Sequence, residues 1–234
     1  MIGIRIADIN VALQNRYGYT EALCREYAHP FSAPDLVVSV TDEDIAEEIK
    51  NADIPINAEY AESVCLHREI AERLWAYDAF LLHSALIECD GVGYAFAARS
   101  GVGKSTHIRL WKKNFGDRVR IVNGDKPIVR LSELGVFAYG TPWNGKERYG
   151  ENRCCPLRAL CFIERGAQNT IVPISTDEAV ARIFPQIYLP KNADGAAATL
   201  DLLDSFVSKV AFFRLACNME DEAALVAHRA MSAF

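Results

Sequence analysis

A run of glycines ahead of a lysine and two hydroxyl residues carries the clearest chemistry in this sequence. Residues 98–106 read Ala-Arg-Ser-Gly-Val-Gly-Lys-Ser-Thr. Glycines at this spacing allow positive φ angles, so successive backbone N–H groups can turn inward at a helix N-terminus and bind phosphate oxygens. Ala98 stands where such loops usually have glycine. The sequence therefore predicts a phosphate-binding loop.

The side chains of this loop predict ATP with Mg²⁺ as the ligand. Lys104 is placed to reach the β and γ phosphates, and the Ser105 hydroxyl to bind the magnesium ion between them. The backbone N–H groups supply the rest of the cradle, and Thr106 begins the helix whose dipole attracts the phosphates. The residues predicted to bind the nucleotide are Ser100, Gly101, Val102, Gly103, Lys104, Ser105 and Thr106.

The elements around the loop have the order that a phosphate site requires. Residues 92–97 read as a strand that enters the loop, and residues 105–115 have the apolar spacing of a helix. A second strand is predicted at 118–123, and Asp125 follows it. An acid at this place is the expected second magnesium ligand, so Ser105 and Asp125 form the predicted metal site.

A loop further along is a candidate lid or substrate loop. Residues 140–153 are rich in glycine and in polar or cationic side chains. Trp143 lies between two glycines, where an exposed indole needs a partner surface. Lys146, Arg148 and Arg153 are candidates to screen the charge of a transferred group. A plain surface connection is the alternative interpretation.

Three further stretches carry a family resemblance. They read LHSAL (82–86), VNGDKP (122–127) and GTPWNGK (140–146), and the glycine loop continues as HIRLW (107–111). With these runs the chain resembles the family built on the HPr kinase and phosphoenolpyruvate carboxykinase fold, specifically its small single-domain HPr kinase-like members. The resemblance covers residues 80 to 165 and implies a mixed-sheet nucleotide fold.

The resemblance also implies roles for three residues. Asp125 corresponds to the second of two adjacent acids, and Gly124 takes the place of the first, which is the proposed general base of HPr kinases. His83 matches a histidine of the HPr kinase site. Asp125 is then left to combine metal binding with proton acceptance, or His83 assists it. With Lys104, these make up the predicted catalytic set.

The function predicted from these features is an ATP-dependent kinase. Its acceptor is a hydroxyl of Ser or Thr in a peptide or small protein, or of free serine or a similar small alcohol. The main alternative is an ATP-binding sensor or accessory module that transfers nothing, which the missing first acid suggests. A carboxykinase is disfavoured, because the dense cluster of Arg and Lys that its substrate carboxylate needs cannot be assembled from this sequence.

Composition limits the partners and the compartment. The chain has 234 residues, a net charge of −6 and 50% apolar or aromatic residues, which is typical of a soluble globular protein. An acidic chain without basic runs predicts neither a nucleic-acid nor a membrane partner. Seven cysteines without a CxxC pair or a signal peptide indicate free thiols and a cytoplasmic location. The sequence leaves open whether a homo-oligomer forms.

Periodicity predicts a single α/β domain over residues 1–234. Residues 1–78 supply N-terminal strands and helices packed on the sheet, and residues 79–234 form the P-loop kinase core. Asp90-Gly91 predicts a tight hairpin ahead of the glycine loop, which requires an antiparallel neighbour and hence a mixed sheet.

Other elements are predicted from alternation, helical spacing and capping residues. Thr41 is expected to cap a helix with Ile45 and Ile49 facing inward, and Thr176 to cap a later one. The remaining predictions are helices at 58–76, 196–210 and 220–231, strands at 80–89, 157–164, 170–174 and 211–216, and a hairpin of 127–131 with 136–139.

Overall fold

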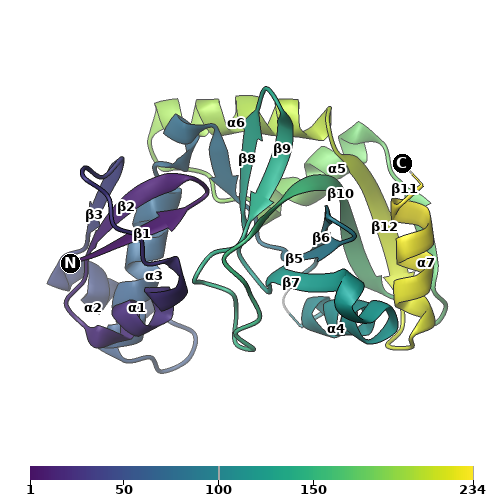
Figure 1. The fold of residues 1–234 in the computed structure, drawn as a ribbon, viewed down its shortest axis with the longest axis horizontal. Coiled ribbons are helices and arrows are strands. Elements are labelled where there is room, and N and C mark those ends of the chain that lie inside the picture. Colours follow the sequence, from purple (N-terminus) through teal and green to yellow (C-terminus); the bar gives the residue numbers. More distant parts are fainter. Residues whose placement is uncertain (100, 234) are drawn as a thin grey trace.

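A nine-stranded mixed β-sheet forms the centre of the computed structural model, which describes residues 1–99 and 101–233 (Figure 1). Twelve-residue β10 joins its two halves: the first residues pair with β9, and the rest lie parallel between β6 and β12. The mixed α/β sheet predicted from the hairpin is confirmed. The strands are β4 (Ala79–Leu81), β5 (Ala85–Cys89), β6 (Val92–Ala97), β7 (Val119–Asn123), β8 (Ile128–Ser132), β9 (Gly135–Tyr139), β10 (Cys154–Arg165), β11 (Thr170–Pro173) and β12 (Ala211–Cys217).

Helices cover both faces of this sheet because its central strands are apolar on both sides. Along β6, Tyr94 and Phe96 pack with helices α4 (Lys104–Phe115) and α7 (Glu222–Met231). The alternate residues, Ala95 and Ala97, face the other way. On that face lie α5 (Thr176–Ile183) and α6 (Ala193–Val207). The strand that enters the glycine loop is therefore held rigidly from both sides.

The N-terminal part of the chain forms a smaller sheet with its own helices, drawn in purple and blue in Figure 1. We call it the N-terminal unit. Strands β1 and β2 are antiparallel, and β2 and β3 are parallel. Its elements are β1 (Ile2–Ile6), β2 (Ile9–Gln14), β3 (Leu36–Ser39), α1 (Gly18–Cys24), α2 (Asp42–Asn51) and α3 (Ala58–Ala71).

Two local predictions are confirmed in detail. Asp90 and Gly91 have φ values of 53° and 81°, the left-handed pair that a tight hairpin between β5 and β6 needs. Thr41 caps α2 through a reciprocal capping box with Asp44.

The continuous strand predicted over 80–89 is wrong. The chain forms β4 and β5, which pair with β8 and with β6 and β7 respectively. Between them the Ser84 N–H donates to the Leu82 carbonyl, and the His83 N–H donates to the carbonyl of Gln186. The apolar run hid this break because both strands are buried, and burial alone does not distinguish one strand from two.

Smaller corrections concern helix ends. The predicted helix 58–76 ends as α3 at Ala71, and a 3-10 turn follows at Leu74–Tyr77. Ile49 is 38% exposed rather than inward-facing. Ser175, not Thr176, caps α5, its hydroxyl accepting from the Glu178 N–H. The helix predicted at 196–210 begins and ends three residues earlier, because Asn192 caps it.

Candidate active site

The glycine loop, residues 98–104, connects β6 to α4. Gly101 and Gly103 have φ values of +75° and +130°, the left-handed conformations predicted for them, and a Cβ at either position would meet open space. Glycine is needed here for its φ and not for a close contact. Ala98 is buried without a positive φ, so it replaces the usual glycine without strain. Ser100 lies outside the described residues.

Lys104, His83 and Asp125 meet beside this loop. The Lys104 Nζ lies 3.1 Å from the His83 Nε2 and donates to the Ala98 carbonyl at 3.2 Å, so the side chain folds back across the loop. The same Nε2 lies 3.3 Å from an Asp125 carboxylate oxygen. One ring nitrogen cannot both accept from the lysine and donate to the acid. His83 therefore pairs with one or the other according to where its proton sits.

The surroundings shift the pKa values of both Lys104 and Asp125. Burial lowers the pKa of Lys104 against the opposing effect of Asp125. Burial by itself would raise the pKa of Asp125, but the hydrogen bond from His83 and the charge of Lys126 outweigh it, so the pKa is lowered. Asp125 is a carboxylate at neutral pH and available to a cation.

Asn123, at the end of β7, shapes the turn that presents Asp125. Its Oδ1 accepts from the backbone N–H groups of Asp125 and Lys126 at 2.8 and 2.7 Å. Its Nδ2 donates to the hydroxyl of buried Thr141 at 3.0 Å. Sequence reasoning missed this role, although Asn ahead of Gly-Asp is a signal for such a side-chain turn.

Gly124 has no room for a side chain. A Cβ there would lie 2.6 Å from the Asn144 carbonyl oxygen and 3.2 Å from that of Tyr149. The Gly124 N–H donates to the same Tyr149 carbonyl at 2.8 Å. Because the loop 140–153 crosses directly over this position, its packing excludes the acid that the family resemblance places here.

Trp143 joins that loop to the N-terminal unit. Its indole N–H donates to the Ser63 carbonyl of α3 at 2.9 Å, and its ring stacks on His67 with centroids 4.3 Å apart. The imidazole is buried, and burial lowers its pKa to about 3, so the ring is neutral. Trp143 thus has an internal partner and still lines the cleft described below. The contribution of α3 was missed, because nothing in its sequence marks it as chemical.

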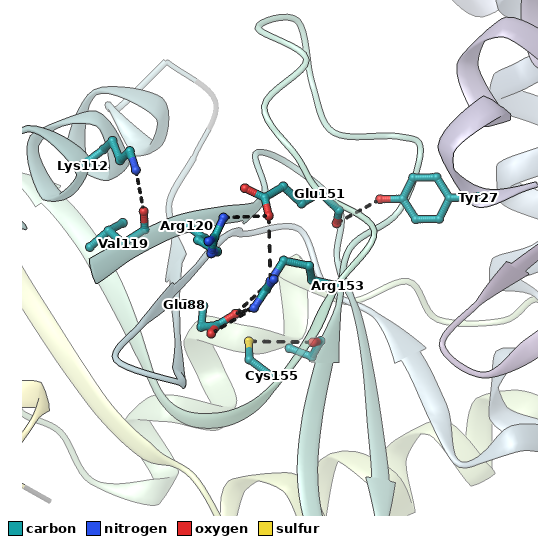
Figure 2. A network of polar contacts seen from close by, with 9 residues as sticks. Tyr27, Glu88, Lys112, Val119, Arg120, Glu151, Arg153 and Cys155 are labelled. Carbon is teal, nitrogen blue, oxygen red and sulfur yellow. Dashed lines mark hydrogen bonds and ion pairs between the residues drawn. The ribbon is translucent and has the colours of Figure 1, made fainter. Parts of the chain in front are cut away.

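Arg153 lies in a separate network (Figure 2). Its guanidinium donates to Glu88 of β5 at 3.0 Å and lies 3.8 Å from Glu151, which also pairs with Arg120. The Tyr27 hydroxyl donates to the Glu151 carbonyl. These contacts fasten the end of loop 140–153 to the sheet and to the N-terminal unit. The structure does not bring Arg153 to the cleft, whereas Lys146 and Arg148 line it.

Lys104, His83, Asp125, Gly124, Trp143 and His67 all line a cleft of about 1040 Å³ between the glycine loop and the N-terminal unit. Its described lining carries five cations, Arg99, Lys104, Lys126, Lys146 and Arg148, and two carboxylates, Asp125 and Glu147. An acidic protein with a locally basic cleft concentrates anions there. Of the predicted nucleotide-binding residues, those lining the cleft are Gly101, Gly103, Lys104, Ser105 and Thr106, while Val102 packs against the core.

The predicted magnesium site passes a chemical test. The Ser105 hydroxyl and the Asp125 carboxylate both line the cleft, and hard oxygen donors of this kind are those that Mg²⁺ prefers. Asp125 is ionised, and the half-buried Lys104 lines the same cleft. The residues present therefore fit the metal.

Comparisons with known proteins give one distant likeness. Neither a family model nor a curated protein matches the sequence. The described helices include none long and apolar enough to cross a membrane. Among solved structures, the Hpr(Ser) kinase/phosphatase from Coxiella burnetii is similar, at 6% identity and a TM-score of 0.36, over 66% of this chain and 99% of that one. Values this low indicate at most a distant relation in fold.

Proposed function

We propose that this protein is an ATP-dependent kinase that transfers the γ-phosphoryl group to a hydroxyl. The acceptor is Ser or Thr in a peptide or small protein, or free serine or a similar small alcohol. The observation that carries the proposal is the meeting of Lys104, His83 and Asp125 beside a glycine loop in one basic cleft. The HPr kinase-like sequence runs support the same class of reaction.

The residues divide the work by position. Backbone N–H groups of the glycine loop and the Lys104 ammonium hold the phosphates. Ser105 and Asp125 would hold Mg²⁺, which when bound neutralises charge on the β and γ oxygens. Lys146 and Arg148, from the exposed part of loop 140–153, screen the charge of the group in transit.

The transfer itself needs a proton acceptor. The acceptor oxygen bonds to the γ phosphorus while the bond to the β-bridging oxygen breaks, and ADP leaves. We assign the hydroxyl proton to the Asp125 carboxylate, since the family's usual base position is Gly124. His83, 3.3 Å from that carboxylate, orients it and can share the proton. The seven cysteines are free, which suits the cytoplasm that we propose as its location.

Gly124 also favours a second candidate function, an ATP-binding sensor without phosphoryl transfer. The packing of Asn144 over Gly124 leaves the end of β7 with a single acid, Asp125, where HPr kinases have two. In a sensor, nucleotide binding would change conformation or partner affinity only.

Label transfer from γ-labelled ATP separates the two functions. The acceptors are free serine, free threonine and a cell extract depleted of small molecules. A kinase labels an acceptor, and Asp125→Asn lowers the rate by about 10²-fold or more while ATP still binds. Asp201→Asn, an exposed acid on α6, serves as the matched control and keeps full activity. Equal labelling by wild type and Asp125→Asn contradicts the role of Asp125, and no labelling by wild type favours the sensor.

A further inference from the structure

The side of the cleft that faces the glycine loop is made by the N-terminal unit. Tyr19 and Leu23 come from α1, Tyr60 and Val64 from α3, and Trp143 from the loop fastened to α3. We call these five residues the aromatic wall. All have apolar or aromatic side chains, and none carries a charge at neutral pH.

The aromatic wall has solvent-exposed aromatic surface that a ligand could contact. The rings of Tyr19 and Tyr60 meet edge to face with centroids 6.1 Å apart, and Tyr60 remains 45% exposed. Paired aromatic rings left open in a cleft offer a large apolar area at low entropic cost to whatever binds there. The phosphate-binding half of the cleft has the opposite character, since Arg99, Lys104 and Lys126 line it.

Asp125 lines the same cleft as the aromatic wall. Burial raises the pKa of Tyr60, and the charge of Asp125 raises it further. At His67 behind the wall, burial and the charge of Lys126 lower the pKa, and the charge of Asp125 opposes them. The proposed proton acceptor is therefore within electrostatic reach of the wall while it touches His83 beside the loop. Under the proposed function the glycine loop holds the nucleotide, so the wall on the N-terminal unit is the part of the cleft left for an acceptor.

His67 lies behind the aromatic wall and supports Trp143. His67 is 5% exposed, stacks on Trp143 and lines the cleft. Its Nε2 has no hydrogen-bond partner among the described residues. Leaving a buried polar atom without a partner costs stability, and a functional role is one of the explanations for such an atom.

Free serine cannot use such a surface, because its side chain has only one methylene. A cleft of about 1040 Å³ is at the upper end of the usual 300–1,000 Å³ of a ligand site, so part of a peptide can lie in it beside a nucleotide. We propose that the aromatic wall binds the acceptor and selects a peptide in which apolar or aromatic residues flank the phosphorylated Ser or Thr. The phosphorylation of the bound peptide rests on the proposed kinase function, whereas the binding of the peptide to the wall does not depend on it.

Binding is measured first, without any transfer. The probe is a positional library of fluorescein-labelled nonapeptides with a central serine, titrated by fluorescence anisotropy in the presence of Mg²⁺ and a non-hydrolysable ATP analogue. Wild type should bind apolar or aromatic flanks about tenfold more tightly than glycine flanks, as expected for one buried aromatic contact. Tyr60→Ala and Tyr19→Ala should lose that preference, and Tyr60→Phe should keep it.

Controls separate this inference from general damage and from the kinase proposal. Leu225→Ala removes a side chain that is 44% exposed on α7, outside the cleft, and should change nothing. ATP-analogue affinity should be the same for wild type and the tyrosine variants. The inference is overturned if wild type binds peptides with all flanking residues equally well. It is also overturned if Tyr60→Ala weakens the binding of the ATP analogue instead of the binding of the peptide. Selective peptide binding without label transfer would support the proposed peptide-binding role of the aromatic wall and contradict the proposed kinase function.

Discussion

Gly124 decides what chemistry the end of β7 can do. A side chain at this position would collide with the carbonyl oxygens of Asn144 and Tyr149. The packing of loop 140–153 against Gly124 therefore leaves no room for a second acid there. The end of β7 keeps one carboxylate, Asp125, which lies beside His83. In the proposed kinase, proton acceptance and metal binding then fall on this neighbouring pair instead of on two adjacent acids.

The first prediction concerns this close packing. Gly124→Ala should lower the free energy of unfolding by about 1–3 kcal/mol, because the new methyl group forces backbone carbonyls apart. Urea denaturation followed by circular dichroism measures the change. Gly18→Ala is the control, since a Cβ there meets nothing and the φ is ordinary; it should be neutral within about 0.5 kcal/mol. Equal stability of Gly124→Ala and wild type would show that the loop does not press on this position.

Among single residues, the sequence predicted those that belong to a recognisable motif. It did not predict those whose role depends only on their position in the folded protein. Lys104 and Asp125 were predicted from spacing and meet at the cleft. Arg153 was predicted to join them, but Glu88 on a distant strand holds it elsewhere. His67 gave no signal, because its partner Trp143 lies 76 positions later in the chain and only the fold brings them together.

Among the elements, helix α4 does more than end the glycine loop. His107, in its first turn, is 2% exposed and accepts a hydrogen bond from the Trp111 indole at 3.0 Å. It also packs edge to face on Phe96 of β6. Burial lowers the pKa of His107 to about 3. The helix is thus fixed to the strand by a histidine that must stay neutral.

This histidine predicts a pH dependence of stability. The unfolded chain binds a proton below pH 6.5 that folded His107 does not bind until about pH 3. Stability is therefore full above pH 6.5 and falls as the pH decreases, by up to about 1.4 kcal/mol per pH unit for this group. His67 adds a similar slope. Burial also lowers the pKa of His228, which adds to the slope. Urea titrations from pH 7 to 5 should therefore give a clearly smaller slope for His107→Gln than for wild type; an unchanged slope would contradict a neutral buried ring.

The elements themselves were predicted best where a local signal marks their ends. The Asp90-Gly91 hairpin and the Thr41 cap were placed correctly, because a turn or a cap depends on a few adjacent residues. The break between β4 and β5 was not, since it follows from pairing with β8 and with the segment around Gln186, both far along the chain. Long-range pairing leaves no trace in a local apolar pattern.

Over the whole molecule, we propose that the N-terminal unit and the kinase core form one domain. The core cluster of the N-terminal unit continues into Leu81 of β4 and Ile128 of β8, and Trp143 and Tyr188 pack on it. Because the apolar contacts cross from one part to the other, thermal unfolding should be a single cooperative transition. Differential scanning calorimetry should give equal calorimetric and van't Hoff enthalpies. Two separated transitions would contradict a single domain.

Charge is also distributed on the scale of the whole chain. The protein carries a net charge of −6, yet cationic side chains outnumber carboxylates in its cleft. Lys104, Lys126 and Arg99 are among these cations. Such a contrast repels anions from most of the surface and concentrates them at one place. Under the proposed function, that anion is magnesium-bound ATP.

The most direct test of this account is calorimetric titration of Mg²⁺-ATP into wild type, Lys104→Ala and Lys113→Ala. Lys113 lies on the same helix but is exposed and paired with Asp221, so it controls for loss of charge. Removing the Lys104 contact should cost about 1.5–3 kcal/mol of binding free energy, a weakening of about tenfold or more. Lys113→Ala should match wild type. Equal ATP affinity for Lys104→Ala and wild type, or no ATP binding by wild type, would contradict a phosphate site at the glycine loop.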